Sequence, residues 1–277
     1  AQQFLGELRK TNTTLVLCPM DNDAADRCEL RDQPLTLLRA LTRVKEEDTS
    51  AAIVLPKGFA KAQASFTPVQ IDFYSSTTPT TPDPVRIHGY LREMADRFAS
   101  ACVMEVSSHS LDQDRVRGVR FASAVFTNLT QDHLDYHGTM DNYLRAKARL
   151  FTGLAPGAAA VLNRDDPAAL AMAEELQRGV RVLWYGLSPD ADVRAENLRL
   201  GPDGTRFTMV MPNGRVEMFL RLVGLHNVHN ALGAAAAALS LGASELTVAS
   251  ALEDARAVPG RLEQVDTSVG TGGRVRT

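Results

Sequence analysis

One lysine occupies a position that suggests chemistry, because it interrupts an apolar helix face. Residues 140–151 have helical spacing, and one face of the predicted helix carries Met140, Tyr143, Lys147, Leu150 and Phe151. Two interpretations are open. Either the stem of the lysine packs while its amine reaches water, or the amine is partly buried and shares a site with acidic and histidine residues upstream.

Acidic, imidazole and amide groups precede this lysine and stand within or just after apolar runs. Glu105 lies inside the run 102–106, which otherwise has the composition of a buried strand, and the run 122–129 includes Thr127 and Asn128 near its end. Polar groups bunched at strand ends are where open α/β sheets bind ligands. We therefore expect an active site in this part of the chain.

Several of these side chains could bind a hard divalent cation: Glu105, Asp132, His133, Asp135 and His137. Magnesium (Mg2+) takes only one or two protein carboxylates together with waters and phosphates, so a sparse set suits it. The set suits zinc poorly, since the sequence has neither HExxH nor a cysteine cluster. Equally open is the interpretation that Asp132 caps a helix or turn and that the histidines are ordinary surface groups.

Two further groups have both a chemical and a plain interpretation. Ser107-Ser108-His109 could suggest nucleophilic catalysis, but the G-x-S-x-G elbow of serine hydrolases is missing. Gln113 and Arg115 either orient a carboxylate or phosphate, which arginine does bidentately, or are solvated loop residues.

The stretch 75–84, SSTTPTTPDP, cannot be a regular element. It is either a surface linker or a rigid loop that presents hydroxyls and backbone donors to an anionic or sugar ligand. Asn227 and Asn230 stand at the start of an alanine-rich helix, where capping and close packing could explain them.

The order of predicted elements indicates an α/β fold. Helix and strand patterns alternate from residue 84 to residue 185, which favours a mainly parallel sheet in three layers with its helices. Strand-like runs separated by GPDG and PNG turns then indicate a small antiparallel sheet, and two helices follow. The antiparallel runs are 192–200, 206–211 and 215–223, and the helices are 227–241 and 244–255. Upstream, candidate strands lie at 14–18, 51–55 and 69–73, and Asp32 with Pro34 resembles a helix start.

Composition is that of an ordinary globular protein, with 44% hydrophobic and 23% charged residues. The formal net charge of −3 gives no reason to expect nucleic acid or an anionic membrane as a partner. Three cysteines without metal-finger spacing suit a reducing cytosol better than a disulfide framework. No apolar run approaches a membrane span. We expect a cytoplasmic monomer without membrane insertion.

Long motifs carry a family resemblance that spacing alone does not supply. The stretch Met104–Phe151 resembles the Mur ligases, and within them the MurE type, the UDP-N-acetylmuramoyl-tripeptide synthetases. The resemblance extends through TTPDP at 80–84, NRDDP at 163–167, GLHNVHNALGAAAAA at 224–238 and VPGRLEQV at 258–265. It implies the family's central domain, with a fold like that of P-loop NTPases.

The activity that this resemblance implies is ATP-dependent amide-bond formation in peptidoglycan synthesis. In that family ATP phosphorylates the terminal carboxylate of UDP-MurNAc-L-Ala-D-Glu, and the amine of a diamino acid, lysine or meso-diaminopimelate, then attacks the acyl phosphate. The implied partners are therefore the UDP-MurNAc-dipeptide, a diamino acid and ATP, with Mg2+ offsetting charge during phosphoryl transfer.

Residue by residue, the resemblance implies three groups of roles. Glu105 and His133 match magnesium ligands, and Lys147 matches a lysine that the family carries as a metal-binding carbamate. These three are the implied catalytic residues. The positions that hold the UDP-MurNAc-dipeptide are matched by Thr80, Thr81, Ser107, Gln113 and Arg115. Positions near the nucleotide are matched by Asn227, Asn230 and Arg261.

One departure from the family pattern concerns the nucleotide. No G-x-x-x-x-G-K-[ST] phosphate loop occurs in the chain, and residues 1–75 contain nothing like it. We expect weakened ATP binding, because the loop's backbone donors and lysine are missing. The expected organisation is an unassigned N-terminal segment at 1–75, a central ligase domain at 76–265 and a tail at 266–277, with the family's C-terminal domain absent.

These departures leave alternatives to an active ligase. One is a non-catalytic module that binds a UDP-muramyl peptide or a Mur partner, which the missing loop favours. Another is a sister ligase such as folylpolyglutamate or cyanophycin synthetase. Against the sister ligases stand TTPDP and SSHSLDQDR, which match the muramyl-peptide site.

Overall fold

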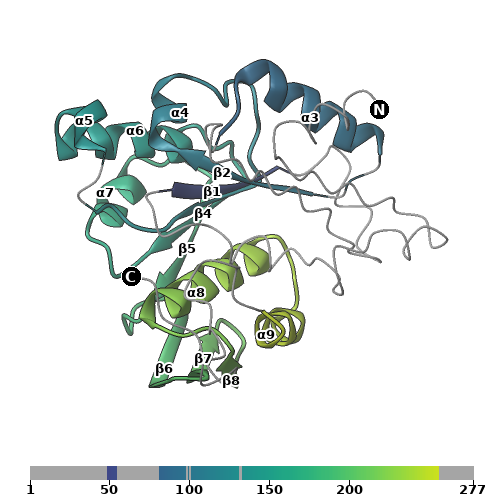
Figure 1. Cartoon of the computed structure of the whole chain (residues 1–277), viewed down its shortest axis with the longest axis vertical. Coiled ribbons are helices and arrows are strands. Elements are labelled where there is room, and N and C mark those ends of the chain that lie inside the picture. The colour runs from purple at the N-terminus through teal and green to yellow at the C-terminus, as the bar shows by residue number, and fades with distance from the viewer. Residues whose placement is uncertain (1–48, 55–80, 98, 100, 131–132, 256–277) are drawn as a thin grey trace, which may run out of the picture.

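The computed structural model describes residues 49–54, 81–97, 99, 101–130 and 133–255 (Figure 1). The strands expected at 14–18 and 69–73 and the helix start at Asp32 lie outside the described residues. So do three residues named as site candidates: Thr80, Asp132 and Arg261.

Within the described residues, all strands form one sheet in the order β2-β1-β3-β4-β5-β6-β7-β8. They are β1 (Thr49–Val54), β2 (Cys102–Ser107), β3 (Ser123–Phe126), β4 (Ala159–Asn163), β5 (Arg181–Gly186), β6 (Val193–Gly201), β7 (Gly204–Met211) and β8 (Gly214–Leu220). The strand expected at 51–55 is therefore part of the sheet as β1, while Leu55 lies outside the described residues.

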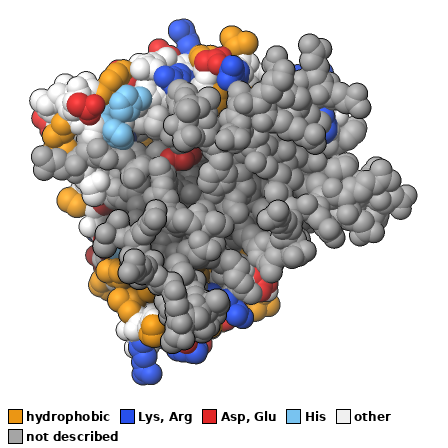
Figure 2. Space-filling view, viewed as in Figure 1, with side chains coloured by type: hydrophobic (Ala, Val, Ile, Leu, Met, Phe, Trp, Pro, Cys, Tyr) orange, Lys and Arg blue, Asp and Glu red, His pale blue; other side chains and the backbone are white. Residues whose placement is uncertain are grey.

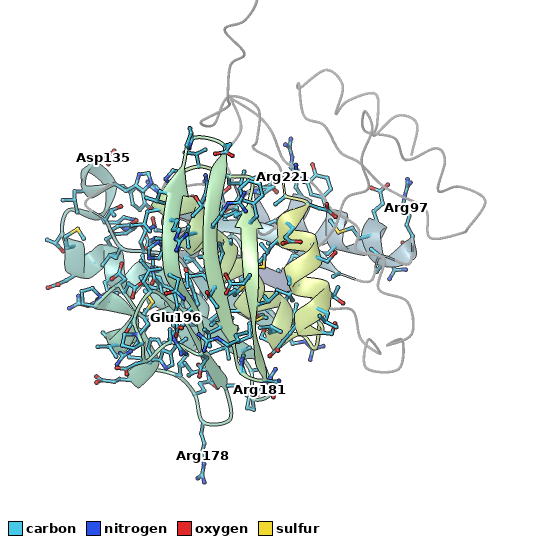
Figure 3. The ribbon with its side chains drawn as sticks, turned by 90° about the horizontal axis from the view of Figure 1, so that it is seen from below. Arg97, Asp135, Arg178, Arg181, Glu196 and Arg221 are labelled. Carbon is cyan, nitrogen blue, oxygen red and sulfur yellow. The ribbon has the colours of Figure 1, made fainter. Side chains whose placement is uncertain are left out.

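The sheet combines parallel and antiparallel pairs. β3 to β6 pair in parallel, whereas β1 lies between β2 and β3 and is antiparallel to both. β6, β7 and β8 are antiparallel neighbours that lie side by side in Figure 3. Because β6 also pairs in parallel with β5, these strands extend the main sheet. The predicted α/β fold with a mainly parallel sheet is confirmed, and the small antiparallel sheet predicted from the turns is the antiparallel end of this one sheet.

Helices cover both faces of the sheet (Figure 1). They are α3 (Pro84–Asp96), α4 (Ser108–Asp112), α5 (Leu134–His137), α6 (Met140–Thr152), α7 (Ala168–Glu174), α8 (Leu225–Ser240) and α9 (Glu245–Glu253). The longer helices agree with the periodicity of the sequence to within a few residues. The short α4 and α5 were not predicted, since one helical turn gives no periodic signal.

Two hydrophobic cores lie on opposite faces of the sheet. Successive side chains of a strand point to opposite faces, so Val103 of β2 joins the core under α8 and α9, while Met104 joins the core under α3, α6 and α7. β3 alternates in the same way with Val125 and Phe126. The result is a three-layer arrangement, and the carboxyl ends of the parallel strands share one edge of the sheet.

Side-chain caps fix where the two helices nearest the expected site begin. Asp83 accepts a hydrogen bond from the Arg86 amide at the start of α3, where Pro84 takes the first helical position. Thr139 accepts from the Asn142 amide at the start of α6. The cap of α6 sets the rotation of that helix, and therefore the face on which Lys147 lies.

Candidate active site

Lys147 is buried in the middle of α6, with 1% of its surface exposed. Its Nζ donates a hydrogen bond of 2.9 Å to the carbonyl of Asn128, directly after β3. The ammonium lies 5.8 Å from the ring centroid of Phe126 and 5.2 Å from that of Tyr143. The interpretation in which the amine reaches water is therefore wrong, and the chain holds an amine inside the protein at a strand end.

A second group of contacts joins the TTPDP loop to the end of β2. Thr81 is fully buried, and its Oγ1 donates to the carbonyl of Glu105 at 3.0 Å and accepts from the amide of Ser107 at 3.1 Å. Arg115 donates to the Thr81 carbonyl at 2.9 Å and to Oε1 of Gln113 at 2.9 Å. The described substrate candidates are thus adjacent, and Arg115 is not a freely solvated loop residue.

The serines after β2 have structural partners. Ser107 caps α4 by accepting from the Ser110 amide, and Ser108 is 1% exposed with its Oγ 2.9 Å from Nε2 of His137. A hydroxyl buried in this way cannot reach a substrate carbonyl. The geometry agrees with the sequence in disfavouring a serine hydrolase.

Imidazole and phenol rings pack together between α4 and α5. The ring of His109 lies 4.7 Å from His133, 4.2 Å from Tyr136 and 5.3 Å from His137, measured between centroids. Histidine side chains gather on this part of the surface in Figure 2. Burial lowers the pKa of His109, and His133 lowers it further; burial and then His109 lower the pKa of His137.

His133 has a strained backbone, with φ of 52° in the left-handed region that non-glycine residues avoid. Such strain persists only where the surrounding structure enforces it, and it is frequent at functional sites. His137 is buried against Ser108, whereas Asp135, labelled in Figure 3, is exposed in the first turn of α5. Of the histidines, His137 is therefore not an ordinary surface group.

The described residues hold no group of three or more His, Cys, Asp or Glu side chains that could bind a metal ion. A zinc-type cluster is thus absent from this part of the chain, while Mg2+ needs fewer protein ligands. In the part of the chain that the structure describes, two buried side-chain polar atoms lack a hydrogen-bond partner, Oδ1 of Asn128 and the hydroxyl of Tyr143. Both residues contact Lys147, so these two atoms could form hydrogen bonds to a further group bound beside the amine.

The carboxyl ends of β4 and β5 are tied to the start of α8. Asp165 accepts from the amides of Leu187 at 2.6 Å and Ser188 at 2.9 Å, and its Oδ2 lies 2.9 Å from Nε2 of His229. An added Cβ on Gly186 would stand 2.6 Å from that carboxylate, so only glycine fits there. Sequence reasoning gave neither Asp165 nor His229 a role, although Asp165 lies within the NRDDP motif.

The nucleotide candidates lie in the first turns of α8. This helix is capped by Gly224 and has no side-chain cap; Asn227 instead lies inside it and donates from Nδ2 to the Val223 carbonyl at 2.9 Å. The capping interpretation of Asn227 is therefore wrong. Asn230 follows one turn later and is half-buried. The two amides stand on the same stretch of helix as His229.

A separate cavity of about 830 Å³ lies at the opposite edge of the sheet, where the parallel strands begin. Its lining includes Ala159 and Arg181, the first residues of β4 and β5, together with Ser240 and Glu245. Lys147 and Asp165 belong to the other edge. The candidate chemistry is thus not in this cavity.

Comparison with known proteins identifies the family. A family profile described as "Mur ligase middle domain" matches residues 48–238, well over half of the chain. The chain belongs to the Mur ligase family. Mur ligases are acid–amino-acid ligases, and the predicted family resemblance is confirmed.

Two relatives that are 44–46% identical to this chain carry the name of the same Mur ligase, a 2,6-diaminopimelate ligase. The chain is 46% identical over 197 residues to the UDP-N-acetylmuramoyl-L-alanyl-D-glutamate--2,6-diaminopimelate ligase of Geobacter metallireducens, covering 69% of this chain and 38% of the relative. It is 44% identical over 193 residues to the protein of that name from Bacillus licheniformis, covering 68% and 39%. The chain thus spans about two-fifths of the length of these Mur ligases.

Solved structures agree with the family assignment. A structure of UDP-N-acetylmuramoyl-L-alanyl-D-glutamate--2,6-diaminopimelate ligase matches with a TM-score of 0.63 at 28% identity, covering 82% of this chain and 45% of that one. A MurF structure from Acinetobacter baumannii matches with a TM-score of 0.50 at 28% identity, covering 53% and 32%. None of the helices described for this Mur ligase chain has the length and apolar character to cross a bilayer.

Proposed function

We propose that this chain supplies the middle domain of a MurE-type ligase that joins diaminopimelate to UDP-MurNAc-L-Ala-D-Glu with ATP and Mg2+. Diaminopimelate is preferred to lysine because the relatives at 44–46% identity carry it in their names. The observation that carries the proposal is the buried Lys147, whose amine lies at the carboxyl end of β3 beside Asn128 and Tyr143, each of which has a buried polar atom without a hydrogen-bond partner among the described residues.

Lys147 acts in this proposal as a carbamate. The lone pair of the unprotonated amine forms an N–C bond to CO2, one C=O π pair moves onto oxygen, and an amine proton leaves to solvent. Once the lysine has lost its ammonium proton, this step converts a buried neutral amine into a buried anion with two oxygen ligands, which suits Mg2+ in company with Glu105 and His133. When bound, the metal would offset the negative charge that develops as the γ-phosphoryl group transfers.

In this proposal, residues at the end of β2 and in and around α4 position the UDP-MurNAc-dipeptide. Thr81 and Arg115 are already held together by the 2.9 Å bond between the guanidinium and the Thr81 carbonyl, and Gln113 orients the same guanidinium. Preorganised donors of this kind can hold the peptide carboxylate without reorganisation at the moment of reaction. Ser107 contributes through its place at the start of α4, and Thr80 and Arg261 remain candidates from the sequence alone.

The nucleotide is assigned to the start of α8. Asn227 and Asn230 lie beside His229, whose bond to Asp165 links this helix to the loops after β4 and β5. Ligands of open α/β sheets bind in the crevice outside the carboxyl ends of the strands, where these groups stand. Because the chain has no phosphate loop, we expect its own affinity for ATP to be weak.

Phosphate release tests this function. The chain is incubated with ATP, Mg2+ and UDP-MurNAc-L-Ala-D-Glu, and with meso-diaminopimelate or L-lysine in parallel reactions. A ligase releases phosphate only when the dipeptide and diaminopimelate are both present, and Lys147→Arg abolishes that release. Release that ignores the diamino acid would contradict the assignment of a MurE-type ligase.

A second function, a non-catalytic module that binds the UDP-muramyl peptide, is favoured by the missing phosphate loop. It predicts binding of UDP-MurNAc-L-Ala-D-Glu by calorimetry with no phosphate release under any combination of substrates. Magnesium-dependent ATP binding at micromolar strength would exclude this alternative.

A further inference from the structure

Two buried side-chain polar atoms lack a hydrogen-bond partner among the described residues: the hydroxyl of Tyr143 and Oδ1 of Asn128. Folded proteins pair nearly all such atoms, and each exception needs an explanation. Both exceptions belong to residues that contact Nζ of Lys147. Their shared neighbour makes a ligand a better explanation than two unrelated packing defects.

Tyr143 is the more informative of the two, because its side chain is completely buried. A buried hydroxyl without a partner destabilises the folded state, and phenylalanine would fill the same space without that cost. The ring itself is well packed: it stacks on His137 at 5.2 Å and meets His133 edge-on at 6.4 Å between centroids. Among the described residues, the phenol oxygen therefore makes no hydrogen bond that would stabilise the fold.

Phe126, Asn128 and Tyr143, which are among the groups that contact the Lys147 amine, differ in what they can donate. Phe126 offers only its ring, and the Asn128 carbonyl is an acceptor that already takes the amine's hydrogen. Tyr143 contributes an O–H group with no acceptor in the described structure. An anionic oxygen attached to Nζ would supply that acceptor.

We infer that the hydroxyl of Tyr143 is a binding group for the carbamate of Lys147 and donates a hydrogen bond to one of its oxygens. This inference rests on the carbamate in the proposed function and deepens it by naming the residue that stabilises the modified lysine. Tyr143 lies one helical turn before Lys147 on α6, so the donor and the anion are held by the same rigid element. The carbonyl oxygen of Asn128 keeps its bond to the carbamate N–H.

The chain contains a matched control in Tyr185. This tyrosine is also buried in the sheet core, at 1% exposure, but its hydroxyl donates to the Phe126 carbonyl at 2.9 Å. Tyr143→Phe removes a hydroxyl without a partner, whereas Tyr185→Phe breaks a hydrogen bond. We expect Tm to rise by about 2–4 °C in the first variant and to fall by about 2–4 °C in the second.

Carbamate loading is the test of the inference. The full chain, Tyr143→Phe and Tyr185→Phe are titrated with 13C-bicarbonate at alkaline pH with Mg2+, and the carbamate carbon is followed by NMR. Lys147→Arg identifies the signal by abolishing it. Because a hydrogen bond to an anion is strong, Tyr143→Phe should need about tenfold more bicarbonate for half-loading. Tyr185→Phe should load like the unmodified chain.

Three outcomes overturn the inference and are distinguishable. Equal loading of Tyr143→Phe and the unmodified chain would leave the carbamate in place but make the hydroxyl a packing defect. Weaker loading accompanied by a lower Tm would indicate lost packing instead of a lost bond. No carbamate signal in the unmodified chain would overturn the carbamate proposal itself, and with it the role of Tyr143.

Discussion

At the scale of single residues, Lys147 illustrates which properties of a site a sequence contains. Its place on an apolar helix face could be predicted from the spacing of Tyr143, Leu150 and Phe151, and the structure buries it as that pattern indicates. Its partner could not be predicted. Asn128 lies on another element, and the contact exists only because α6 packs across the end of β3.

Replacing Lys147 separates stability from function. Lys147→Met fills a similar volume without burying a charge, so we expect the free energy of unfolding to change by less than about 1.5 kcal/mol while carbamate loading is lost. The control variant Arg145→Met, at an exposed position of α6, should change the free energy of unfolding by less than about 0.5 kcal/mol. Urea denaturation measures both. A loss above about 3 kcal/mol in Lys147→Met would make the amine a structural group.

At the scale of elements, the sequence predicts individual helices, strands and turns but does not predict contacts between residues that are far apart in the chain. The strands and the longer helices from residue 84 onward follow from hydrophobic periodicity and from the turn residues between β6, β7 and β8, whereas the short α4 and α5 do not. The apolar run of β1 has no feature that encodes direction. Its antiparallel insertion between β2 and β3 is therefore visible only in the structure. The same holds for the ring cluster of His109 and His133, which joins two short helices.

Two glycines in helices should respond to alanine in opposite ways. An added Cβ on Gly233 of α8 would lie 3.1 Å from the ring of Tyr185, whereas one on Gly89 of α3 meets nothing within 4 Å. Gly89→Ala should stabilise the protein by about 0.5–1 kcal/mol through helix propensity. Gly233→Ala should destabilise it by about 1–3 kcal/mol through overpacking. Thermal unfolding measures both changes, and stabilisation by Gly233→Ala would contradict the close contact of α8 with β5.

At the scale of the whole molecule, the described chain has two distinct sheet edges. The carboxyl edge holds Lys147, the Thr81–Arg115 contacts and the Asp165–His229 link, while the cavity near Arg181 opens at the other edge. The family could be predicted from motifs. These groups lie at one edge because β3, β4 and β5 pair in parallel and because β1, antiparallel to both β2 and β3, gives β2 the same direction as β3.

Cys102 reports on the integrity of the whole fold. Burial raises the pKa of this thiol from its ordinary value of 9.0 to about 12. The thiol is thus protonated in the folded chain and ionised in the unfolded chain between these pH values. Stability should therefore fall as pH rises from about 9 toward 12. Peptide-resolved alkylation at pH 8 should leave Cys102 unmodified until the protein unfolds, and rapid labelling under native conditions would contradict its burial.

The proposed function requires most directly that the Thr81–Arg115 end of the sheet binds a UDP-muramyl peptide. Calorimetric titration of UDP-MurNAc-L-Ala-D-Glu into the chain measures this, with Arg115→Met as the test and Arg178→Met, an exposed position labelled in Figure 3, as the control. We expect the chain to bind this peptide, Arg115→Met to weaken the binding by about tenfold or more, and Arg178→Met to leave it unchanged. Absence of binding, or equal affinity in all three proteins, would contradict the proposed function.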